Sequence, residues 1–191
     1  MSEVPPEQNA GLWKRLTSTR WRVAWGYLGA VLLLVLARPT PGSILAGLPL
    51  VAAGEAIRIV ANGTLVKDKQ LTDRGIYAHL RHPLYLGSSL MGIGFVIMAR
   101  DLVLTVVMGV LFVALYRRQI HREEEKMEVF FGEDYLRWAR RTPRFLPRRF
   151  RPGEIAAHFT FQKAWVNREH EGLLGAAAVT AVLWLKYLLL G

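Results

Sequence analysis

A group of hydrogen-bonding side chains stands where an apolar run begins, in the segment GIYAHLRHPLYLG (residues 75–87). Its candidate binding residues are Tyr77, His79, Arg81, His82, Pro83 and Tyr85. Arginine and histidine beside tyrosines suit an anionic group and a flat ring. This composition indicates a binding site at the edge of an apolar helix, with plain anchoring at a membrane interface as the alternative.

A second polar group follows the apolar run 102–116. It contains Arg117, Arg118, His121, Arg122, Glu123, Glu124 and Glu125. Adjacent glutamates suit a cation or a pair of hydroxyls. The two groups flank a predicted antiparallel hairpin over residues 84–116, so they should be neighbours. A ligand with a carboxylate, an ammonium, a ribose and an adenine would use all of these groups. The alternative is a solvated helix face with i,i+4 ion pairs.

A metal site is the competing chemistry for the same residues. His79 and His82 are three residues apart and could face Glu123 or Glu124 across the hairpin. However, Pro83 disfavours helical backbone at His82, so the pair is a weak metal signal. We therefore expect no metal. The chain has no cysteine, which excludes disulfides, thiolate metal sites and a cysteine nucleophile.

Long apolar runs must position these residues. The chain has 191 residues, 52% of them apolar, which suggests one membrane domain over residues 1–191. Five runs predict transmembrane helices: Trp21–Ala37, Ser43–Ala61, Leu84–Ala99, Leu102–Tyr116 and Gly172–Leu190. The third and fourth fall short of the roughly 20 residues that a spanning helix needs, so we interpret them as a short helical hairpin. The expected fold is an all-α polytopic membrane protein with a cofactor site on the cytoplasmic side.

The charges predict an orientation. Basic residues precede the first run, lie between the second and third, and cluster between Arg117 and Arg168, whereas the other two turns hold only Arg38 and Arg100. By the positive-inside rule the N-terminus is cytoplasmic and the C-terminus outside, in an inner or plasma membrane. The net charge of +10 then reflects anionic headgroups, and we expect no nucleic-acid partner.

Two ionisable residues lie inside the second run. Glu55 and Arg58 are three apart and can pair on one helix face. Because an ionisable group at membrane depth costs at least about 2.5 kcal/mol unless it is paired or hydrated, both should face the bundle interior. They form either a structural ion pair or a wall of a substrate pocket.

Two segments together resemble a known family. GIYAHLRHPLYLG is similar to the Gly-x-Tyr-x-x-x-Arg-His-Pro-x-Tyr-x-Gly segment of the isoprenylcysteine carboxyl methyltransferase family. The run REEEKMEVFFGEDYLRWARRTPRFLP (residues 122–147) resembles its second segment: a glutamate pair, Phe-Gly-x-x-Tyr and an Arg-x-Pro-Arg ending. The resemblance covers about residues 60–147. Residues 148–191 extend beyond the point where many members stop.

The resemblance implies an S-adenosylmethionine-dependent methyltransferase that modifies a lipid or prenylated small molecule in the bilayer, with S-adenosylhomocysteine as product. The implied cofactor residues are Asn62, Gln70, Leu71, Thr72, Tyr77, Arg81, His82, Pro83, Tyr85, Glu123 and Glu124. The implied catalytic residues are Arg118, Arg122 and Glu124, since either arginine matches the family's substrate-contacting position. Glu55, Arg58 and Arg118 are the candidate substrate residues.

Some functional questions stay open at this level. An amine or hydroxyl acceptor needs a general base, for which His121, Glu124, Glu55 and His170 are candidates. The segment 159–172 forms either a lid that carries Asn167, Arg168, Glu169 and His170, or an amphipathic connector. The alternative functions are an NADPH-dependent membrane sterol or lipid reductase, which shares the Arg-His-Pro-x-Tyr segment, and a non-enzymatic membrane scaffold. The oligomeric state is not predicted.

Overall fold

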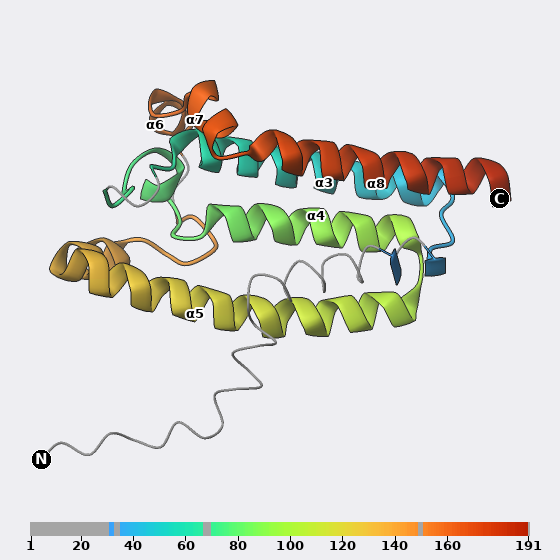
Figure 1. Ribbon diagram of the computed structural model, residues 1–191, viewed down its shortest axis with the longest axis horizontal. Helices are drawn as coiled ribbons and strands as arrows, with labels where there is room; N and C mark the ends of the chain where they lie inside the picture. Colours follow the sequence, from blue (N-terminus) through green and yellow to red (C-terminus); the bar gives the residue numbers. More distant parts are fainter. Residues whose placement is uncertain (1–30, 33–34, 67–69, 149–150, 191) are drawn as a thin grey trace, which may run out of the picture.

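The described part of the protein is built of helices and loops. The computed structural model describes residues 31–32, 35–66, 70–148 and 151–190, and these contain no strand. Long helices lie roughly parallel or antiparallel (Figure 1). In chain order the elements are α3 (Pro41–Thr64), the short 3₁₀ helix η1 (Gly75–Ala78), α4 (Pro83–Ala99), α5 (Leu102–Arg141), α6 (Pro152–Ala157), α7 (Phe161–Val166) and α8 (Glu169–Leu190). The all-α prediction is confirmed for these residues.

Helices α3 and α4 pack closely through glycines. Gly47 faces Gly94, and seven residues further along α3 Gly54 faces Gly87. A Cβ at Gly94 would lie 2.7 Å from the carbonyl oxygen of Gly47, so the two backbones are nearly in contact. Small residues allow such an approach inside a membrane, where packing rather than water exclusion drives association.

The turn RPTPG starts α3 as a helix cap. Thr40 is the N-cap: its hydroxyl accepts from the Ser43 backbone N–H at 3.2 Å, and the Ser43 hydroxyl accepts from the Thr40 N–H at 2.9 Å. This reciprocal capping box satisfies amides that lack helical partners. The predicted second run, Ser43–Ala61, lies within α3, but the helix continues past the predicted stop at Asn62 and Gly63 to Thr64.

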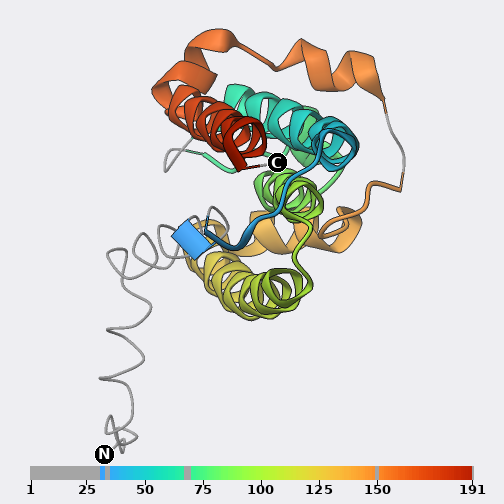
Figure 2. The same ribbon diagram turned by 90° about the vertical axis from the view of Figure 1, so that its right-hand side faces the viewer.

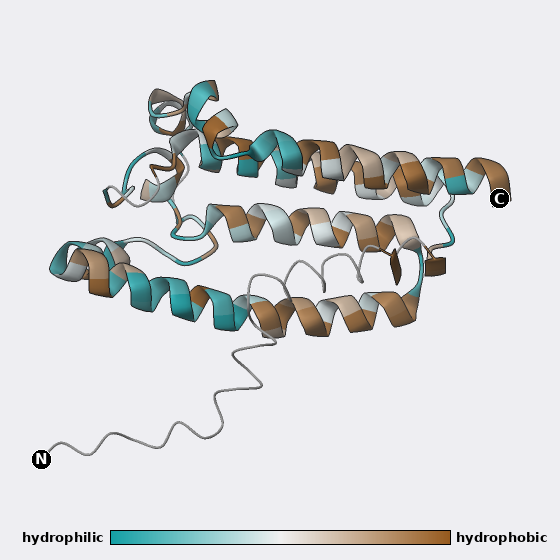
Figure 3. Ribbon diagram, in the orientation of Figure 1, coloured by the Kyte–Doolittle hydropathy of each residue, from teal (hydrophilic) through white to brown (hydrophobic). Residues whose placement is uncertain are grey.

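Helix α5 is longer than the fourth apolar run. Arg100 ends α4 in a left-handed conformation, and Asp101 caps α5 by accepting from the Leu104 N–H at 2.8 Å. The predicted run ends at Tyr116, but the helix continues to Arg141 and is 40 residues long, because its polar half, rich in glutamate and arginine, also favours helix. Figure 3 shows the change from an apolar half to a hydrophilic half. The second polar group therefore lies on the same helix as the fourth run.

Gly132 interrupts α5. Its backbone has φ 51° and ψ −126°, a conformation that a side chain would strain, so the helix kinks there and resumes. The chain then returns towards α4. Backbone N–H groups of Arg81 and His82 donate to the carbonyls of Pro143 and Arg144 at 2.8 and 3.1 Å. The kink thus brings residues 143 and 144 back to the segment that precedes α4.

Three described helices are long and apolar enough to cross a bilayer, judged by length and composition: α3, α5 and α8. Helix α4 is also apolar but has only 17 residues, about 25 Å at 1.5 Å per residue. Many apolar side chains of α5 and α8 point outward, including Val103, Val110 and Leu189, as expected for helices that face lipid. The first predicted run, Trp21–Ala37, lies largely outside the described residues, so the count of five spans stays a prediction.

The C-terminal segment wraps around the end of α3. Helices α6 and α7 arch over that end before α8 runs back beside α3 (Figure 2). The predicted fifth run, Gly172–Leu190, lies within α8, which starts three residues earlier.

Candidate functional site

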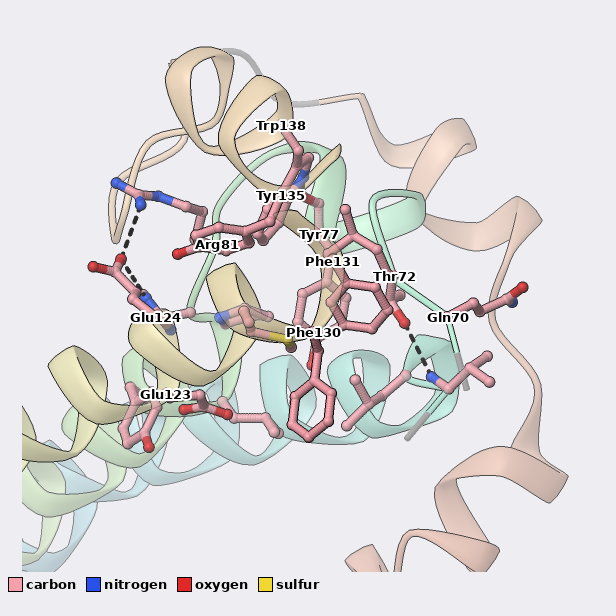
Figure 4. Close-up of a pocket in the computed structure, with 18 residues that line it drawn as sticks. Gln70, Thr72, Tyr77, Arg81, Glu123, Glu124, Phe130, Phe131, Tyr135 and Trp138 are labelled. Atoms are coloured by element: carbon pink, nitrogen blue, oxygen red, sulfur yellow. Dashed lines mark hydrogen bonds and ion pairs between the residues drawn. The ribbon is translucent and has the colours of Figure 1, made fainter. Parts of the chain in front are cut away.

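A cavity of about 560 Å³ opens where the loop after α3, η1, the start of α4 and the polar half of α5 meet (Figure 4). Its lining residues are Leu65, Val66, Gln70, Leu71, Thr72, Tyr77, Arg81, His82, Pro83, Leu84, Tyr85, Glu123, Glu124, Met127, Phe130, Phe131, Tyr135 and Trp138. They include every predicted cofactor residue except Asn62. The two polar segments are therefore neighbours, as the hairpin predicts.

Two hydrogen bonds hold the loops that line this cavity. The Trp138 indole N–H donates to the Tyr77 carbonyl at 3.1 Å, which joins the end of α5 to η1. On the other side, the Val66 N–H donates to the Thr72 hydroxyl at 3.1 Å. Gln70 lines the cavity but is exposed, and its side chain extends away from the other labelled residues (Figure 4).

The Phe-Gly-x-x-Tyr motif has a geometric explanation. Phe131 lies before the kink at Gly132, and Tyr135 lies after it, yet both line the cavity. Residues four apart share one face of a straight helix. The kink changes the direction of the helix after Gly132, and in this arrangement Tyr135 and Trp138 line the cavity with side chains that are almost fully buried. We therefore expect the glycine to be required at this position.

Glu124 is the centre of a charged network. Its Oε1 lies 2.9 Å from Arg81 Nη1 and 3.0 Å from His82 Nε2, and its Oε2 lies 2.7 Å from Arg144 Nη2. The two polar groups thus contact each other across the hairpin, and Arg144 is an additional partner from the returning chain. Three partners around one carboxylate hold it ionised and in a defined orientation.

His82 is held as a neutral, oriented ring. It is the N-cap of α4, its backbone is non-helical (φ −125°, ψ 59°), and Pro83 occupies the first helical position, as the sequence predicts. Burial lowers the pKa of His82, and the neighbouring Glu124 opposes that effect only in part. The neutral ring can then donate from Nε2 to Glu124. Burial also raises the pKa of Tyr77, which remains a protonated phenol.

A second cavity, of about 600 Å³, adjoins the first at Glu124, which lines both. It is lined by Ser89, Phe112, Val113, Tyr116, Arg117, Arg118, Ile120, His121, Glu124, Arg144 and Phe145. One end is apolar and lies between α4 and α5, and the other carries arginines. Tyr85 of the first cavity packs edge-on against Tyr116 of the second, with ring centroids 4.9 Å apart.

The structure separates the predicted catalytic arginines. Arg118 lines the second cavity, whereas Arg122 is exposed and lines neither cavity. The two arginines lie four positions apart on α5, and only Arg118 is among the residues that line the second cavity. Among the candidate general bases, His121 and Glu124 line the second cavity. Glu55 and His170 line neither.

Asn62, Glu55 and Arg58 lie away from both cavities. The Asn62 amide donates to Glu169 of α8, because the end of α3 turns that side chain towards the C-terminal segment. Arg58 also binds Glu169, at 2.8 Å, and lies 3.9 Å from Glu55. Glu55 and Arg58 therefore face other helices, as predicted, but Glu169 rather than Glu55 is the main partner of Arg58. Asn62, Glu55 and Arg58 are therefore not among the residues that line the cavities, and their roles at the cofactor and the acceptor stay predictions.

The segment 159–172 and the pair His79 and His82 can also be placed. Asn167, Arg168, Glu169 and His170 do not line either cavity, so the segment 159–172 does not cover them. His79 turns away from His82: its Nδ1 donates to the Gly75 carbonyl at 3.0 Å and its Nε2 accepts from the Arg151 N–H at 3.2 Å. Within the described residues, no group of three or more histidine or acidic side chains could hold a metal ion.

Several residues that line the cavities have no role predicted from the sequence. Arg144 belongs to the Arg-x-Pro-Arg ending, for which the resemblance implies no function. Met127, Phe130 and Trp138 form much of the apolar wall. Helical spacing is the signal that could have found Met127 and Phe131. Met127 lies three residues after Glu124 and four after Glu123, and Phe131 lies seven residues after Glu124.

Two buried polar atoms test whether the cavity suits the expected cofactor. Arg81 Nε and Glu123 Oε2 have no hydrogen-bond partner among the described residues, although both residues line the cavity. A buried donor or acceptor without a hydrogen-bond partner costs free energy, so such atoms in a cavity indicate a place where a ligand or water can bind. A guanidinium N–H suits a carboxylate, and a carboxylate oxygen suits hydroxyls or an ammonium. S-adenosylmethionine carries all of these groups and an aromatic base for the apolar wall.

Comparison with known proteins shows a family to which part of this chain is similar. Residues 42–129 match the model of the isoprenylcysteine carboxyl methyltransferase (ICMT) family. The predicted resemblance to this family is therefore confirmed, over a segment that contains α3, α4 and most of α5.

Individual relatives agree with this match. The chain is 27% identical over 106 residues to the protein-S-isoprenylcysteine O-methyltransferase of Schizosaccharomyces pombe, covering 56% of this chain and 45% of that protein. It is 33% identical over 114 residues to the enzyme of the same name from Rattus norvegicus, covering 53% and 40%. It is also 35% identical over 82 residues to the cobalt-zinc-cadmium resistance protein CzcN of Cupriavidus metallidurans, covering 43% and 38%.

The chain spans less than half the length of these three relatives. No solved structure matches the chain.

Proposed function

We propose that this protein is an integral membrane methyltransferase that uses S-adenosylmethionine to methylate a lipid or a prenylated small molecule. The observation that carries the proposal is the first cavity, which gathers ten of the eleven predicted cofactor residues from two distant segments. The match to the methyltransferase family supports the same function.

In this proposal the first cavity holds the cofactor. Arg81 Nε binds its carboxylate, Glu123 binds hydroxyls or the ammonium, and the aromatic wall holds the base. The bound cofactor supplies a methyl group already activated by its sulfonium. The protein's own contribution is positioning, which can supply most of the acceleration of such a transfer. His82 and Arg144 keep Glu124 oriented at the boundary between the two cavities.

The second cavity is the proposed acceptor site. Its apolar end, formed by Phe112 and Val113, suits a hydrocarbon chain, and Arg118 and Arg144 suit an anionic head group. A carboxylate acceptor needs no general base. If the acceptor is an amine or hydroxyl, His121 and Glu124 are the candidates that line this cavity.

The cofactor and the acceptor are expected to arrive from different sides. We infer that the N-terminus and the cofactor site lie in the cytoplasm and that the C-terminus lies outside, in the inner or plasma membrane. The support is the distribution of basic residues in the sequence. A C-terminal alkaline phosphatase fusion should be active under this topology, whereas a fluorescent C-terminal green fluorescent protein fusion would contradict it.

Calorimetry on the purified protein in detergent tests the function. S-adenosylhomocysteine should bind to the wild type and NADPH should not. His82→Ala and Tyr85→Ala should each weaken S-adenosylhomocysteine binding by about 1–3 kcal/mol, the loss expected for a charged or buried hydrogen bond. Tyr187→Ala, on α8 and outside both cavities, is the matched control. Binding of NADPH alone, or an unchanged affinity for S-adenosylhomocysteine in both folded cavity variants, would refute the proposal.

A further inference from the structure

The end of α3 is completed by a segment far away in the sequence. The last carbonyls of a helix have no partner within it. In α3 the Asn167 side-chain amide donates to the carbonyl of Asn62 at 2.8 Å and to that of Leu65 at 3.1 Å. The Thr160 N–H donates to the carbonyl of Gly63 at 2.9 Å. The chain between α6 and α8 therefore acts as the C-terminal cap of α3.

Close packing accompanies these hydrogen bonds. The ring of Phe159 lies directly against Gly63, where any side chain would collide with it. Phe159 in turn packs edge-on against Phe161, with ring centroids 4.8 Å apart. The last turn of α3 has no basic side chain to bind its carbonyls, so this distant segment provides the cap.

The capped residues lead directly into the first cavity. Leu65, whose carbonyl accepts from Asn167, is itself a lining residue, and so is the next residue, Val66. The Val66 N–H holds the Thr72 hydroxyl, which lines the cavity too. A chain of two hydrogen bonds thus connects Asn167, outside the cavity, to its loop wall.

An ion pair anchors the same segment to two other helices. Glu169 is 4% exposed and accepts from Arg58 Nε at 2.8 Å and from Arg58 Nη2 at 3.1 Å. The third nitrogen, Arg58 Nη1, donates to the Ser88 hydroxyl of α4 at 2.7 Å. Glu169 also accepts from the Asn62 amide. A bidentate arginine–carboxylate pair has a well-defined geometry, so it fixes where the segment begins α8.

We propose that Asn167, anchored by Glu169, is a positioning residue for the cofactor cavity: it holds the loop wall that begins at Leu65 in its binding conformation. The cofactor part of this inference rests on the proposed function. The C-terminal extension is then neither a lid nor a passive connector. It stabilises one wall of the cavity from behind, without touching the ligand.

The experiment compares two substitutions at Asn167 with a control on α7. Asn167→Ala removes the donor, and Asn167→Asp places a carboxylate oxygen against two carbonyls. Gln162→Ala changes an exposed residue five positions earlier. For each variant, hydrogen–deuterium exchange of residues 61–66 and the Kd for S-adenosylhomocysteine are measured in the same detergent.

Both Asn167 variants should exchange faster over residues 61–66, and the Kd should rise about tenfold, which corresponds to about 1.4 kcal/mol. Gln162→Ala should match the wild type. Exchange that stays at the wild-type rate in Asn167→Ala overturns the inference whether or not the ligand binds. Faster exchange with an unchanged Kd also overturns it, because Asn167 would then stabilise the helix end only. A wild type that exchanges slowly but binds no S-adenosylhomocysteine contradicts the proposed function instead.

Discussion

At the scale of single residues, the site depends on one carboxylate and its three partners. Glu124 contacts Arg81 and His82, which precede α4, and Arg144, which lies in the chain after the kink. The contribution of each partner can therefore be measured separately. Two predictions concern the partners whose surroundings differ most, the buried His82 and the more exposed Arg144.

We expect acid to destabilise the protein through His82. Burial lowers its pKa below the ordinary value of 6.5, so the folded protein favours the neutral ring. The stability that this preference gives is complete above that value and is lost as the pH falls towards the lowered pKa. Thermal unfolding midpoints between about pH 7.5 and pH 5 should therefore fall more steeply in the wild type than in His82→Asn. Parallel pH profiles would refute this role of the histidine.

Arg144 should matter for turnover although it is more than half exposed. It binds both oxygens of Glu124, at 2.7 and 3.2 Å, and it lines the proposed acceptor cavity. Arg144→Ala should lower kcat/KM for the acceptor by about tenfold to a hundredfold, the effect of losing one or two charge-assisted hydrogen bonds. Arg148→Ala, an exposed arginine four residues later, is the control. Equal activity of the two variants would exclude Arg144 from the site.

At the scale of elements, the closest contact among the described helices is the one between α3 and α4. Its four glycines are spaced seven apart on each helix, so they meet in two pairs. Gly87 and Gly94 of α4 therefore belong to this interface. They do not open a passage towards lipid, because the backbone of α3 fills the space beside them.

Gly94→Ala should destabilise the protein. The new Cβ would lie 2.7 Å from the Gly47 carbonyl oxygen and 2.7 Å from a methyl carbon of Val51, so the helices must separate. Such overpacking lowers the free energy of unfolding by about 1–3 kcal/mol. Gly109→Ala on α5, where nothing lies within 4 Å of the new Cβ, provides the matched control. Thermal unfolding in detergent should separate the two variants, and similar midpoints would show that the interface can relax.

At the scale of the whole molecule, the second cavity lies between α4 and α5, where a lipid acceptor could enter from the bilayer. Removing a long hydrocarbon chain into water costs about 25 cal/mol per Å² of apolar surface, so lateral entry is favoured. On α4, Ser89 lines this cavity, and Gly92 faces α5, with Phe112 3.9 Å from the position of its Cβ. The face of α4 opposite α3 is thus the place to test entry.

Gly92→Trp should block long-chain acceptors selectively. Methyl transfer to a long-chain acceptor should fall by at least about tenfold because the indole would fill the path beside Phe112, whereas the Kd for S-adenosylhomocysteine should not change. A short soluble analogue of the acceptor should retain its activity. If the two acceptors lose activity in equal proportion, entry does not occur between α4 and α5.

Local patterns in the sequence predict most of the described helices and many of the residues that line the first cavity. Apolar runs predicted α3, α4, the first half of α5 and α8, because hydrophobic length is a local property of the chain. The motif around Arg81 and His82 and the glutamate pair predicted residues that do line one cavity. Their juxtaposition followed from the hairpin, which is a short-range feature of topology.

Long-range packing, which the sequence does not reveal, sets which polar residues line the cavities and which lie outside them. Asn62, Arg58 and Glu169 bind one another, an arrangement that depends on two helices more than 100 residues apart. Arg144 joins Glu124 because Gly132 kinks α5 and the chain returns, and no local pattern encodes where a returning chain will lie. Periodicity reports which face of a helix is apolar, but the identity of the neighbour on the polar face is set by long-range packing.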